Sequence, residues 1–285
     1  MSQANDLPAN YLPPKCQPLD SGAARLQAGY SKISAEDAHS SLVGHIVFAC
    51  PERHNVLDLQ AWQALPAVVE QLSGMADMRL IILRGAGDKA FVAGADIAQF
   101  EDAFNGPEGS RYDAATEHGF EALAQCAVPT LAAIQGYCIG GGMGLALACD
   151  IRLAGSDSQF AIPAARLGLG YPANATRRLA AIVGTARARD ILFTARRFDA
   201  TAALEMGAIH YCVATDRFEA ELSTLQAQIA ANAPKTLQTA KFILENPDAP
   251  EQDIRQRLAD CLSSADYAEG RKAFMEKRAP VFRGK

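Results

Sequence analysis

Residues 131–149 contain no charged side chain, and this run of apolar and small residues constrains the fold more than any other part of the chain. Its length matches that of a membrane-spanning helix, and its glycines include a four-residue spacing found in paired membrane helices. The glycines, however, cluster in the middle and divide the run. Residues 130–135 have the pattern of a short buried strand, and residues 142–149 that of a small-residue helix ending at Asp150. We therefore predict a strand, a glycine turn and a helix, and no membrane span.

The turn itself contains three successive glycines, Gly140, Gly141 and Gly142. Without Cβ atoms, a ligand atom can approach the main chain there and meet free N–H groups at the start of a helix. Such N–H groups, aided by the helix dipole, suit a carbonyl oxygen that becomes negative during a reaction. A tight strand-to-helix crossing that needs small residues for packing would give the same pattern. This stretch alone leaves both interpretations open.

A second glycine-containing segment follows the apolar run of residues 80–83, which has the pattern of a buried strand. It leads through residues 91–97 into a helical pattern that includes Phe100 and Phe104. Residues 91–97 together with residues 139–147 resemble the two signature segments of the crotonase superfamily, the enoyl-CoA hydratase/isomerase family. The resemblance extends from about Leu42 to the C-terminus.

This resemblance implies an α/β fold of the crotonase type, a spiral of ββα units with a helical C-terminal portion that forms homotrimers, often paired into hexamers. The order of elements agrees, since strands and helices alternate up to about residue 195 and helices dominate afterwards. The implied substrate is an acyl-CoA thioester. Its carbonyl oxygen would accept hydrogen bonds from the backbone N–H groups of Ala95 and Gly141, which would stabilise a thioester enolate.

Three regions are expected along the chain. Residues 1–28 hold four prolines and little periodicity, so we expect a loosely ordered extension outside the core. Residues 29–200 would form the spiral core, and residues 201–285 the helical region of trimerisation. In the last region we expect a strand at 209–213 and a continuous helical pattern over 251–278.

The chain departs from the family pattern at two catalytic positions. Hydratases of this family carry one glutamate two residues after the glycine triplet and another directly after the proline of the far pocket wall. Here these positions are occupied by Gly144 and Ala164. Neither residue can transfer a proton, so the two-glutamate hydration mechanism is not available.

Several side chains are candidates to replace the glutamates. Tyr171, Arg166 and Asn174 lie on or just after the wall segment, Tyr137 and Cys138 precede the glycine triplet, and Glu117 with His118 lies on an expected helix over 113–126. A buried tyrosine often only packs its ring, and Glu117 and His118 also fit a solvated helix face. One alternative is a decarboxylase acting on methylmalonyl-CoA, with Tyr171, Arg166 or Asn174 at the carboxylate. Another is a non-catalytic protein that binds acyl-CoA.

The resemblance also assigns residues to the CoA moiety, the only cofactor-like group implied. The candidates for substrate and CoA binding are Arg53, His54, Ala93, Asp96, Ile97, Phe274 and Lys277. Lys277 would reach CoA from the C-terminal helix, sometimes across a subunit boundary. The alternative interpretations involve no ligand: His54 would be a surface residue, and Lys277 an ordinary lysine in the last turn of a helix.

Composition and motif searches exclude other classes. A net charge of −5 argues against nucleic acid as the main partner. The seven cysteines lie singly, which suits free thiols in a reducing cytoplasm and predicts no metal site. The chain contains no His-Glu-x-x-His, Gly-x-Ser-x-Gly or Walker motif, and its N-terminus resembles no secretory signal.

Overall fold

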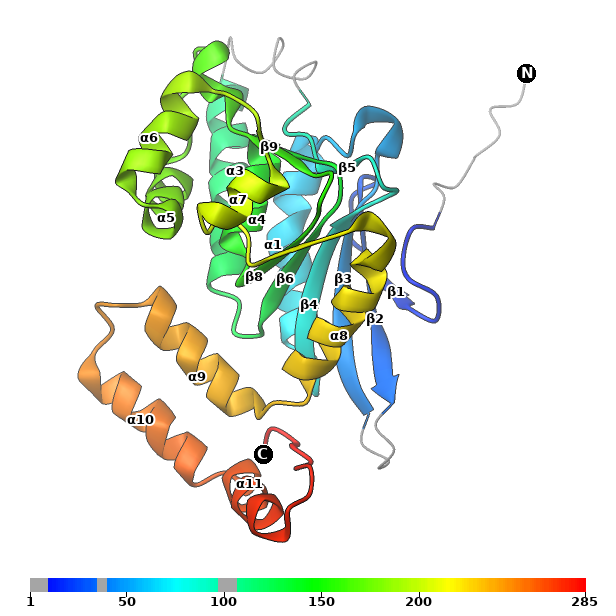
Figure 1. Ribbon diagram of the computed structural model, residues 1–285, viewed down its shortest axis with the longest axis vertical. Helices are drawn as coiled ribbons and strands as arrows, with labels where there is room; N and C mark the ends of the chain where they lie inside the picture. Colours follow the sequence, from blue (N-terminus) through cyan, green and yellow to red (C-terminus); the bar gives the residue numbers. More distant parts are fainter. Residues whose placement is uncertain (1–9, 35–39, 97–106) are drawn as a thin grey trace.

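Two β-sheets form the centre of the computed structural model, which describes residues 10–34, 40–96 and 107–285 (Figure 1). The larger sheet has the order β1-β2-β3-β4-β6-β8-β11 and the smaller the order β10-β9-β7-β5. The strands are β1 (Gln17–Leu19), β2 (Leu26–Ser34), β3 (Ser40–Phe48), β4 (Met78–Gly85), β5 (Ala90–Val92), β6 (Thr130–Ile134), β7 (Tyr137–Ile139), β8 (Ile151–Gly155), β9 (Gln159–Ala161), β10 (Phe198–Asp199) and β11 (Tyr211–Val213).

Helices surround the sheets and dominate the C-terminal third. They are α1 (Leu59–Ser73), α3 (Pro107–Ala124), α4 (Gly141–Ala148), α5 (Ala173–Val183), α6 (Thr185–Thr194), α7 (Ala200–Glu205), α8 (Phe218–Ala230), α9 (Pro234–Glu245), α10 (Glu251–Leu262) and α11 (Ala265–Glu276). Short 3₁₀ turns occur at Pro51–Arg53, Pro163–Arg166 and Thr215–Arg217. The helical pattern expected through Phe100 and Phe104 lies outside the described residues.

The central strands β4 and β6 of the larger sheet are buried on both faces, which explains their nearly continuous apolar sequences. Leu80 and Ile82 of β4 face one way and pack in a cluster with Phe218 of α8. Ile81 and Leu83 face the other way and belong to the main core, which includes α1 and α4. Alternation along the strand thus feeds two separate hydrophobic layers.

The chain builds a spiral by visiting both sheets in turn. Strands β4, β6 and β8 pair in parallel in the larger sheet. The strand that follows each of them, β5, β7 or β9, pairs in parallel in the smaller sheet. The expected spiral of ββα units with a helical C-terminal part is therefore confirmed. Strands β5 and β7 have three residues each, and the sequence pattern predicts no strand in either segment.

The N-terminal segment differs from expectation. From Gln17 onward the chain is part of the larger sheet, since β1 pairs with β2 and β2 pairs along its length with β3, all antiparallel. Leu26 and Ala28 are buried in the main core. The proline content suggested a tail, but β2 pairs with β3 and its alternating apolar residues pack into the main core.

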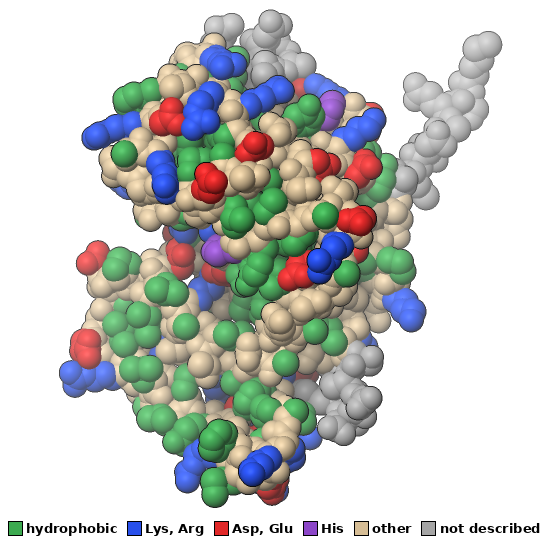
Figure 2. Space-filling model, in the orientation of Figure 1, with side chains coloured by type: hydrophobic (Ala, Val, Ile, Leu, Met, Phe, Trp, Pro, Cys, Tyr) green, Lys and Arg blue, Asp and Glu red, His purple; other side chains and the backbone are tan. Residues whose placement is uncertain are grey.

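The C-terminal helices form an arm that extends from the sheets, with α11 at the lower end of the view (Figure 1). The continuous helical pattern expected over 251–278 is divided in two. The Ser264 side chain caps the start of α11 by accepting a hydrogen bond from the N–H of Tyr267, at 3.0 Å. Hydrophobic side chains lie exposed on this arm (Figure 2), among them Leu244, Leu258, Leu262, Phe274 and Met275.

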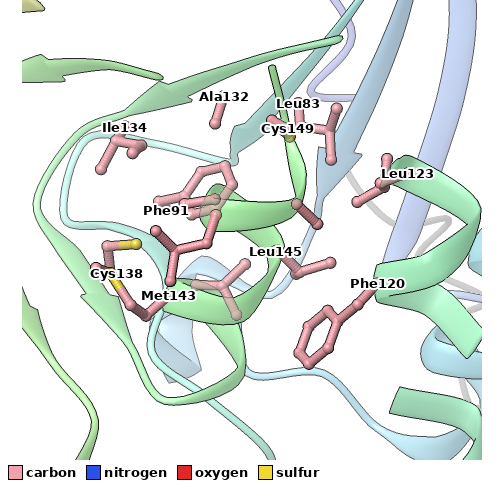
Figure 3. Packing of buried hydrophobic residues seen from close by; sticks show 14 of the residues in the cluster. Leu83, Phe91, Phe120, Leu123, Ala132, Ile134, Cys138, Met143, Leu145 and Cys149 are labelled. Atoms are coloured by element: carbon pink, nitrogen blue, oxygen red, sulfur yellow. The ribbon is translucent and has the colours of Figure 1, made fainter. Parts of the chain in front are cut away.

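Helix α4 is buried around most of its circumference, which accounts for the uncharged stretch (Figure 3). Met143, Leu145 and Leu147 all belong to the main core. In the described part of the chain, no helix is both long and apolar enough to cross a membrane. The backbone of β5 lies against the first turn of α4, because a Cβ added at Gly142 would lie 2.1 Å from the carbonyl oxygen of Val92. Only glycine fits at this crossing.

Gly144, two residues further into α4, has a different reason to lack a side chain. A Cβ added there would lie 2.3 Å from Cζ of the Phe120 ring, which comes from α3. That ring is held edge-on against Trp62 of α1, with ring centroids 5.5 Å apart. The space beside Gly144 is therefore filled by an aromatic side chain from another helix.

We expect Gly144→Ala to lower the free energy of unfolding by about 1–3 kcal/mol, because the added methyl group overpacks this contact. Replacing Phe120 with leucine as well should relieve the overlap, so the double variant should be less destabilised than the sum of the single variants. Urea unfolding of the four proteins measures the coupling. Gly170→Ala is the control, because a Cβ there meets no atom within 4 Å. Strictly additive effects would contradict the proposed contact.

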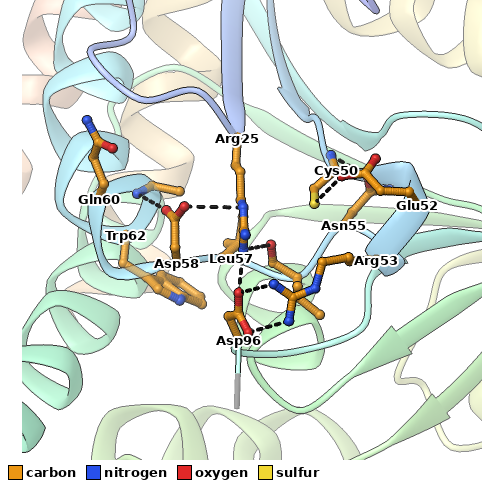
Figure 4. A network of polar contacts seen from close by, with 12 residues as sticks. Arg25, Cys50, Glu52, Arg53, Asn55, Leu57, Asp58, Gln60, Trp62 and Asp96 are labelled. Carbon is orange, nitrogen blue, oxygen red and sulfur yellow. Dashed lines mark hydrogen bonds and ion pairs between the residues drawn. The ribbon is translucent and has the colours of Figure 1, made fainter. Parts of the chain in front are cut away.

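An ion-pair network joins three distant segments beside the glycine turn at Gly94, which follows β5 (Figure 4). Arg53 donates to both carboxylate oxygens of Asp96, at 2.6 and 2.5 Å, and Arg25 donates to the same carboxylate at 2.8 Å. Arg25 also pairs at 3.2 Å with Asp58, whose side chain caps the start of α1. Burial acts to raise the pKa of Asp96, but the hydrogen bonds from Arg25 and Arg53 outweigh it and hold that pKa below the usual range.

We expect Asp96→Asn to lower the free energy of unfolding at pH 7 by about 2 kcal/mol, less than for a fully buried pair because water reaches both arginines. A depressed carboxyl pKa contributes stability above the unfolded value of about 3.9, and this contribution disappears as the pH falls through the folded value. The difference between wild type and Asp96→Asn should therefore shrink below about pH 4. Urea unfolding at several pH values tests this, with exposed Asp88→Asn as the control. A difference independent of pH would refute the ion-pair explanation.

Candidate active site

A cavity of about 850 Å³ opens between the two glycine turns, α3 and the segment after β9. Its walls come from four places in the sequence. They include Ala95 after β5, Gly141 at the start of α4, Thr116 on α3 and Leu167 after the 3₁₀ turn at Pro163–Arg166. The spiral brings these segments together because successive ββα units stack in the same register.

Two residues that line this cavity, Ala95 and Gly141, are of interest for their backbone N–H groups. Ala95 forms a parallel bridge with Leu57, in which the Leu57 N–H donates to Gly94 and the Asp96 N–H donates to Leu57. In such a bridge the N–H of Ala95 points away from Leu57, toward the cavity that Ala95 lines. Gly141 is the first residue of α4, where an N–H has no partner within its own helix. Neither N–H has a hydrogen-bond partner among the residues that the structure describes.

The two glycine turns that present these groups lie against each other. A Cβ added at Gly140 would lie 3.9 Å from Cα of Gly94, and one at Gly94 would lie 3.5 Å from the carbonyl oxygen of Ile139. Both glycines have positive φ, +57° and +111°. Residues with side chains rarely adopt these angles, so glycine is required where the chain turns toward the cavity.

Helix α4 adds a favourable field at the Gly141 end, because its N-terminus carries partial positive charge. The opposite end is neutralised by Arg152 of β8. Its guanidinium group donates at 2.6 Å to the carbonyl of Cys149 and at 2.8 Å to that of Ala208. Arg152 is buried, so this cation is directed at the helix C-terminus with little screening by water.

The cavity wall beneath Gly141 is aromatic and hydrogen-bonded. Trp62 of α1 lies under the turn, since a Cβ at Gly141 would be 2.9 Å from its ring. Its indole N–H donates at 2.7 Å to the Tyr112 hydroxyl, which donates at 3.0 Å to the carbonyl of Leu57. Thr116, one turn along α3, donates to the carbonyl of Tyr112 at 2.9 Å. These groups are committed to one another and fix the wall.

The two positions assigned to the hydratase glutamates lie differently. Ala164 lines the cavity, at the start of the far wall. Gly144 is buried beneath Phe120, so the Phe120 ring occupies the space beside it. Neither position carries a group that could exchange a proton.

Tyr171 lines the cavity, but its hydroxyl is engaged. It donates to the carbonyl of Gly140 at 3.1 Å and so ties the far wall to the glycine turn. Burial raises the pKa of Tyr171 well above the usual value. Such a phenol is a poor proton donor at neutral pH, and its bond supports the turn that presents Gly141.

The other sequence candidates for acid/base chemistry do not line the cavity in the described part of the chain. Arg166 is exposed and does not belong to the described lining. The side chain of Asn174 accepts from the N–H of Ala175 and donates at 3.4 Å to the carbonyl of Glu117, which joins α5 to α3. Glu117 and His118 are exposed on α3, as the solvated-face interpretation requires.

Tyr137 and Cys138, the two candidates that precede the glycine triplet, are also engaged in packing. Cys138 is fully buried, and burial raises the pKa of its thiol well above the usual value. Tyr137 packs its ring against His54, with centroids 5.7 Å apart, and lies under the guanidinium group of Arg197.

The residues assigned to CoA divide into two groups. Ala93 lines the cavity. Asp96 lies three residues after it in the sequence and is ion-paired with Arg53, the residue before His54. The carboxylate of Asp96 is occupied by two arginines, and it supports the turn from behind. Ile97 lies outside the described residues.

Phe274 and Lys277 stand apart from this group. Phe274 is 82% exposed on α11, and Lys277 is the exposed residue that ends this helix. Helix α11 lies at the opposite end of the molecule from β5, β9 and α3 (Figure 1). Within one chain these residues are therefore not brought to the cavity.

Sequence reasoning missed the most informative polar side chain of the cavity. Asp113 of α3 lines it, beside Tyr112, Thr116 and Phe120. The spacing of 112, 116 and 120 marks one helical face and could have been read as a wall. In the sequence pattern, Asp113 falls on the polar side of this helix. Burial, and after it the charge of Glu117, raises the pKa of Asp113.

Metal and charge complete the description of the site. Among the described residues, no group of three or more His, Cys, Asp or Glu side chains could hold a metal ion. The described lining of the cavity contains no lysine, arginine or histidine, and Asp113 is its one carboxylate. The arrangement can thus offer backbone hydrogen bonds to an oxygen and a single carboxylate to a proton.

Comparisons with known proteins agree with this geometry. A family model described as enoyl-CoA hydratase/isomerase matches residues 38–285. The chain is 30% identical over 235 residues to a short-chain-enoyl-CoA hydratase from Clostridium acetobutylicum, an alignment covering 80% of this chain and 89% of that protein. It is 27% identical over 270 residues to a mitochondrial Delta(3,5)-Delta(2,4)-dienoyl-CoA isomerase from Dictyostelium discoideum, covering 89% and 92% of the two chains.

A solved structure gives the same result. An enoyl-CoA hydratase/carnithine racemase from Magnetospirillum magneticum superposes with a TM-score of 0.84 and 31% identity, covering 95% of this chain and 98% of that one. The family model spans most of the chain, and the similar structure spans nearly all of it. The chain therefore belongs to the enoyl-CoA hydratase/isomerase family.

Proposed function

We propose that this protein is an acyl-CoA-processing enzyme that stabilises a thioester enolate with the backbone N–H groups of Ala95 and Gly141. The observation that supports the proposal is the contact between two glycine turns, beside which Ala95 and Gly141 line one cavity and have N–H groups without a partner among the described residues. Membership of the enoyl-CoA hydratase/isomerase family supports the substrate class.

The chemistry follows from the two donors. When a base removes a proton from the α-carbon of a thioester, negative charge moves onto the carbonyl oxygen. Two N–H groups held in place before the reaction stabilise this oxygen without reorganisation, and the N-terminus of α4 adds to the effect. The mostly apolar wall strengthens these interactions by keeping water away.

The CoA moiety would lie at the side of the cavity near Ala93, Arg53 and His54. Phe274 and Lys277 could join it only from a second copy, because α11 of the same chain is remote. The exposed apolar side chains of α10 and α11 support self-association of this kind. We therefore propose that the enzyme works as a homotrimer or as a hexamer of paired trimers.

The decarboxylase alternative has less support. Holding a free carboxylate calls for a cation or several donors, and the described lining offers neither lysine nor arginine. Arg166 is exposed outside the cavity, and the side chains of Asn174 and Tyr171 are already hydrogen-bonded. The negative charge of Asp113 would in addition repel a carboxyacyl group.

A panel of three substrates tests the activity. Crotonyl-CoA, trans-3-hexenoyl-CoA and methylmalonyl-CoA are incubated separately with the protein, and the products are identified by mass and by the absorbance of conjugated thioesters. Hydration or double-bond migration supports the proposal. Loss of carbon dioxide alone would favour the decarboxylase, and tight binding without turnover of any of these esters would favour a binding protein.

We expect Ala95→Pro to lower kcat about 10²- to 10³-fold on any substrate so converted, because proline removes one donor to the developing oxyanion. Ala95→Gly, which keeps the N–H, is the matched control and should stay within a few-fold of wild type. The thermal midpoints of both variants show whether the fold is retained. Unchanged turnover in a folded Ala95→Pro variant would overturn the assignment of this donor.

We expect the wild-type mass in solution to be three or six times the 30.3 kDa of one chain. Leu262→Asp and Phe274→Asp place charges in the exposed apolar surface of α10 and α11 and should shift the mass toward that of one chain. Light scattering after size exclusion measures this. Leu204→Asp, an exposed leucine on α7, is the control. A monomeric wild-type protein would refute the proposed assembly.

A further inference from the structure

We propose that Asp113 is the catalytic acid/base of this site, the side chain that removes a proton from the acyl group and returns it. The inference rests on the proposed acyl-CoA function and goes further, because nothing in the sequence pattern assigned a role to this residue. It also selects a class of reaction. A single carboxylate suits the transfer of a proton between carbon atoms of one substrate.

The first argument is the state of the other protic side chains in the described lining. The Tyr112 hydroxyl accepts from Trp62 and donates to Leu57, and Thr116 donates to the carbonyl of Tyr112. The Tyr171 hydroxyl donates to the carbonyl of Gly140. These groups hold the walls together, and using one as an acid or base would break a bond that shapes the cavity.

Asp113 differs from them in being free and ionisable. Asp113 lines the cavity and has no hydrogen-bond or ion-pair partner among the described residues. Asp113, Glu117 and Glu121 are all exposed on the same helix, but of these three acids only Asp113 belongs to the described lining. Position along α3 therefore singles out Asp113, which follows Tyr112 at the end of the wall-forming face.

The electrostatic surroundings suit a base. Burial raises the pKa of Asp113, and the charge of Glu117 one turn further along α3 raises it again. A carboxylate whose pKa lies nearer neutrality is a stronger base and, once protonated, still gives up its proton readily. No arginine or lysine of the described lining is present to hold it in the charged form.

The reaction can be written for a β,γ-unsaturated acyl-CoA. The Asp113 carboxylate takes a proton from the α-carbon, and the electron pair of that C–H bond forms the carbon–carbon double bond of a dienolate. Its negative oxygen faces the N–H groups of Ala95 and Gly141. Protonated Asp113 then gives its proton to the γ-carbon, which yields the α,β-unsaturated thioester and restores the carboxylate. Atoms and charge balance without a co-reactant.

The test separates this inference from the proposed function by measuring enolate formation directly. Butyryl-CoA is incubated with the protein in D₂O, and deuterium at the α-carbon is counted by mass spectrometry. Conversion of trans-3-hexenoyl-CoA to its conjugated isomer is followed in parallel. The proteins are wild type, Asp113→Asn, Asp113→Glu and Glu121→Gln, which replaces an exposed acid of the same helix.

We expect Asp113→Asn to reduce both rates about 10²- to 10⁴-fold, the usual effect of a positioned acid/base, with little change in KM or thermal midpoint. Asp113→Glu should recover part of the activity, and Glu121→Gln should behave as wild type. If Asp113→Asn retains wild-type exchange, the inference is wrong while the oxyanion site stands. If wild type itself neither exchanges deuterium nor converts any substrate of the panel, the proposed function fails, and this inference with it.

Discussion

The segment after β5 lies directly against the glycine turn before α4, and the rest of the cavity depends on this backbone contact. The carbonyl of Val92 occupies the place of a side chain at Gly142, and Cα of Gly94 approaches Gly140. The Val92 carbonyl leaves no room for a Cβ at Gly142, and Gly94 and Gly140 have positive φ angles that favour glycine, so the chain meets there through its main-chain atoms. Two N–H groups from segments more than forty residues apart in sequence consequently share one cavity.

Charged residues hold this contact from outside the cavity. Arg25 and Arg53 fix Asp96, the residue after Ala95, and Arg152 fixes the far end of α4, which begins at Gly141. Each turn therefore has its own electrostatic support. Removal of Arg25 or Arg53 weakens the pairing of the buried Asp96 carboxylate, and removal of Arg152 leaves buried carbonyl groups without their donor; both changes are costly. The positions of the donors are thus set by charged residues outside the described lining of the cavity.

The sequence predicted features whose signals are local. The glycine triplet, the buried strand at 80–83 and the helices after residue 185 each follow from patterns within a short window. Strands β5 and β7 were missed because three residues carry no periodicity, and only their partners in the smaller sheet make them strands. Arg25 was missed because its partner, Asp96, is 71 residues away. The prolines suggested a tail, but β2 pairs with β3 and β1 pairs with β2, so this segment forms one edge of the larger sheet.

The side chains of the proposed site were harder to predict for a different reason. An amphipathic pattern divides α3 into a buried face and a polar face, and Asp113 falls on the polar side. A cavity placed at the boundary of the two faces turns part of the polar side into a wall, which periodicity alone cannot reveal. In the same way, the order of residues in the wall segment could not show that the side chain of Asn174 donates a hydrogen bond to α3 and that of Tyr171 to the glycine turn.

These two sets of residues carry different constraints. The backbone donors depend on close packing, so changes at Gly142 or Gly144 affect the stability of the whole chain. The side chains that would choose a reaction lie at the cavity surface, where substitutions change stability little. A family built on this fold can therefore keep its enolate site while acids and bases appear at new positions. The proposed role of Asp113 would be such a relocation, since the space beside Gly144 is filled by the Phe120 ring and Asp113 lines the cavity from α3.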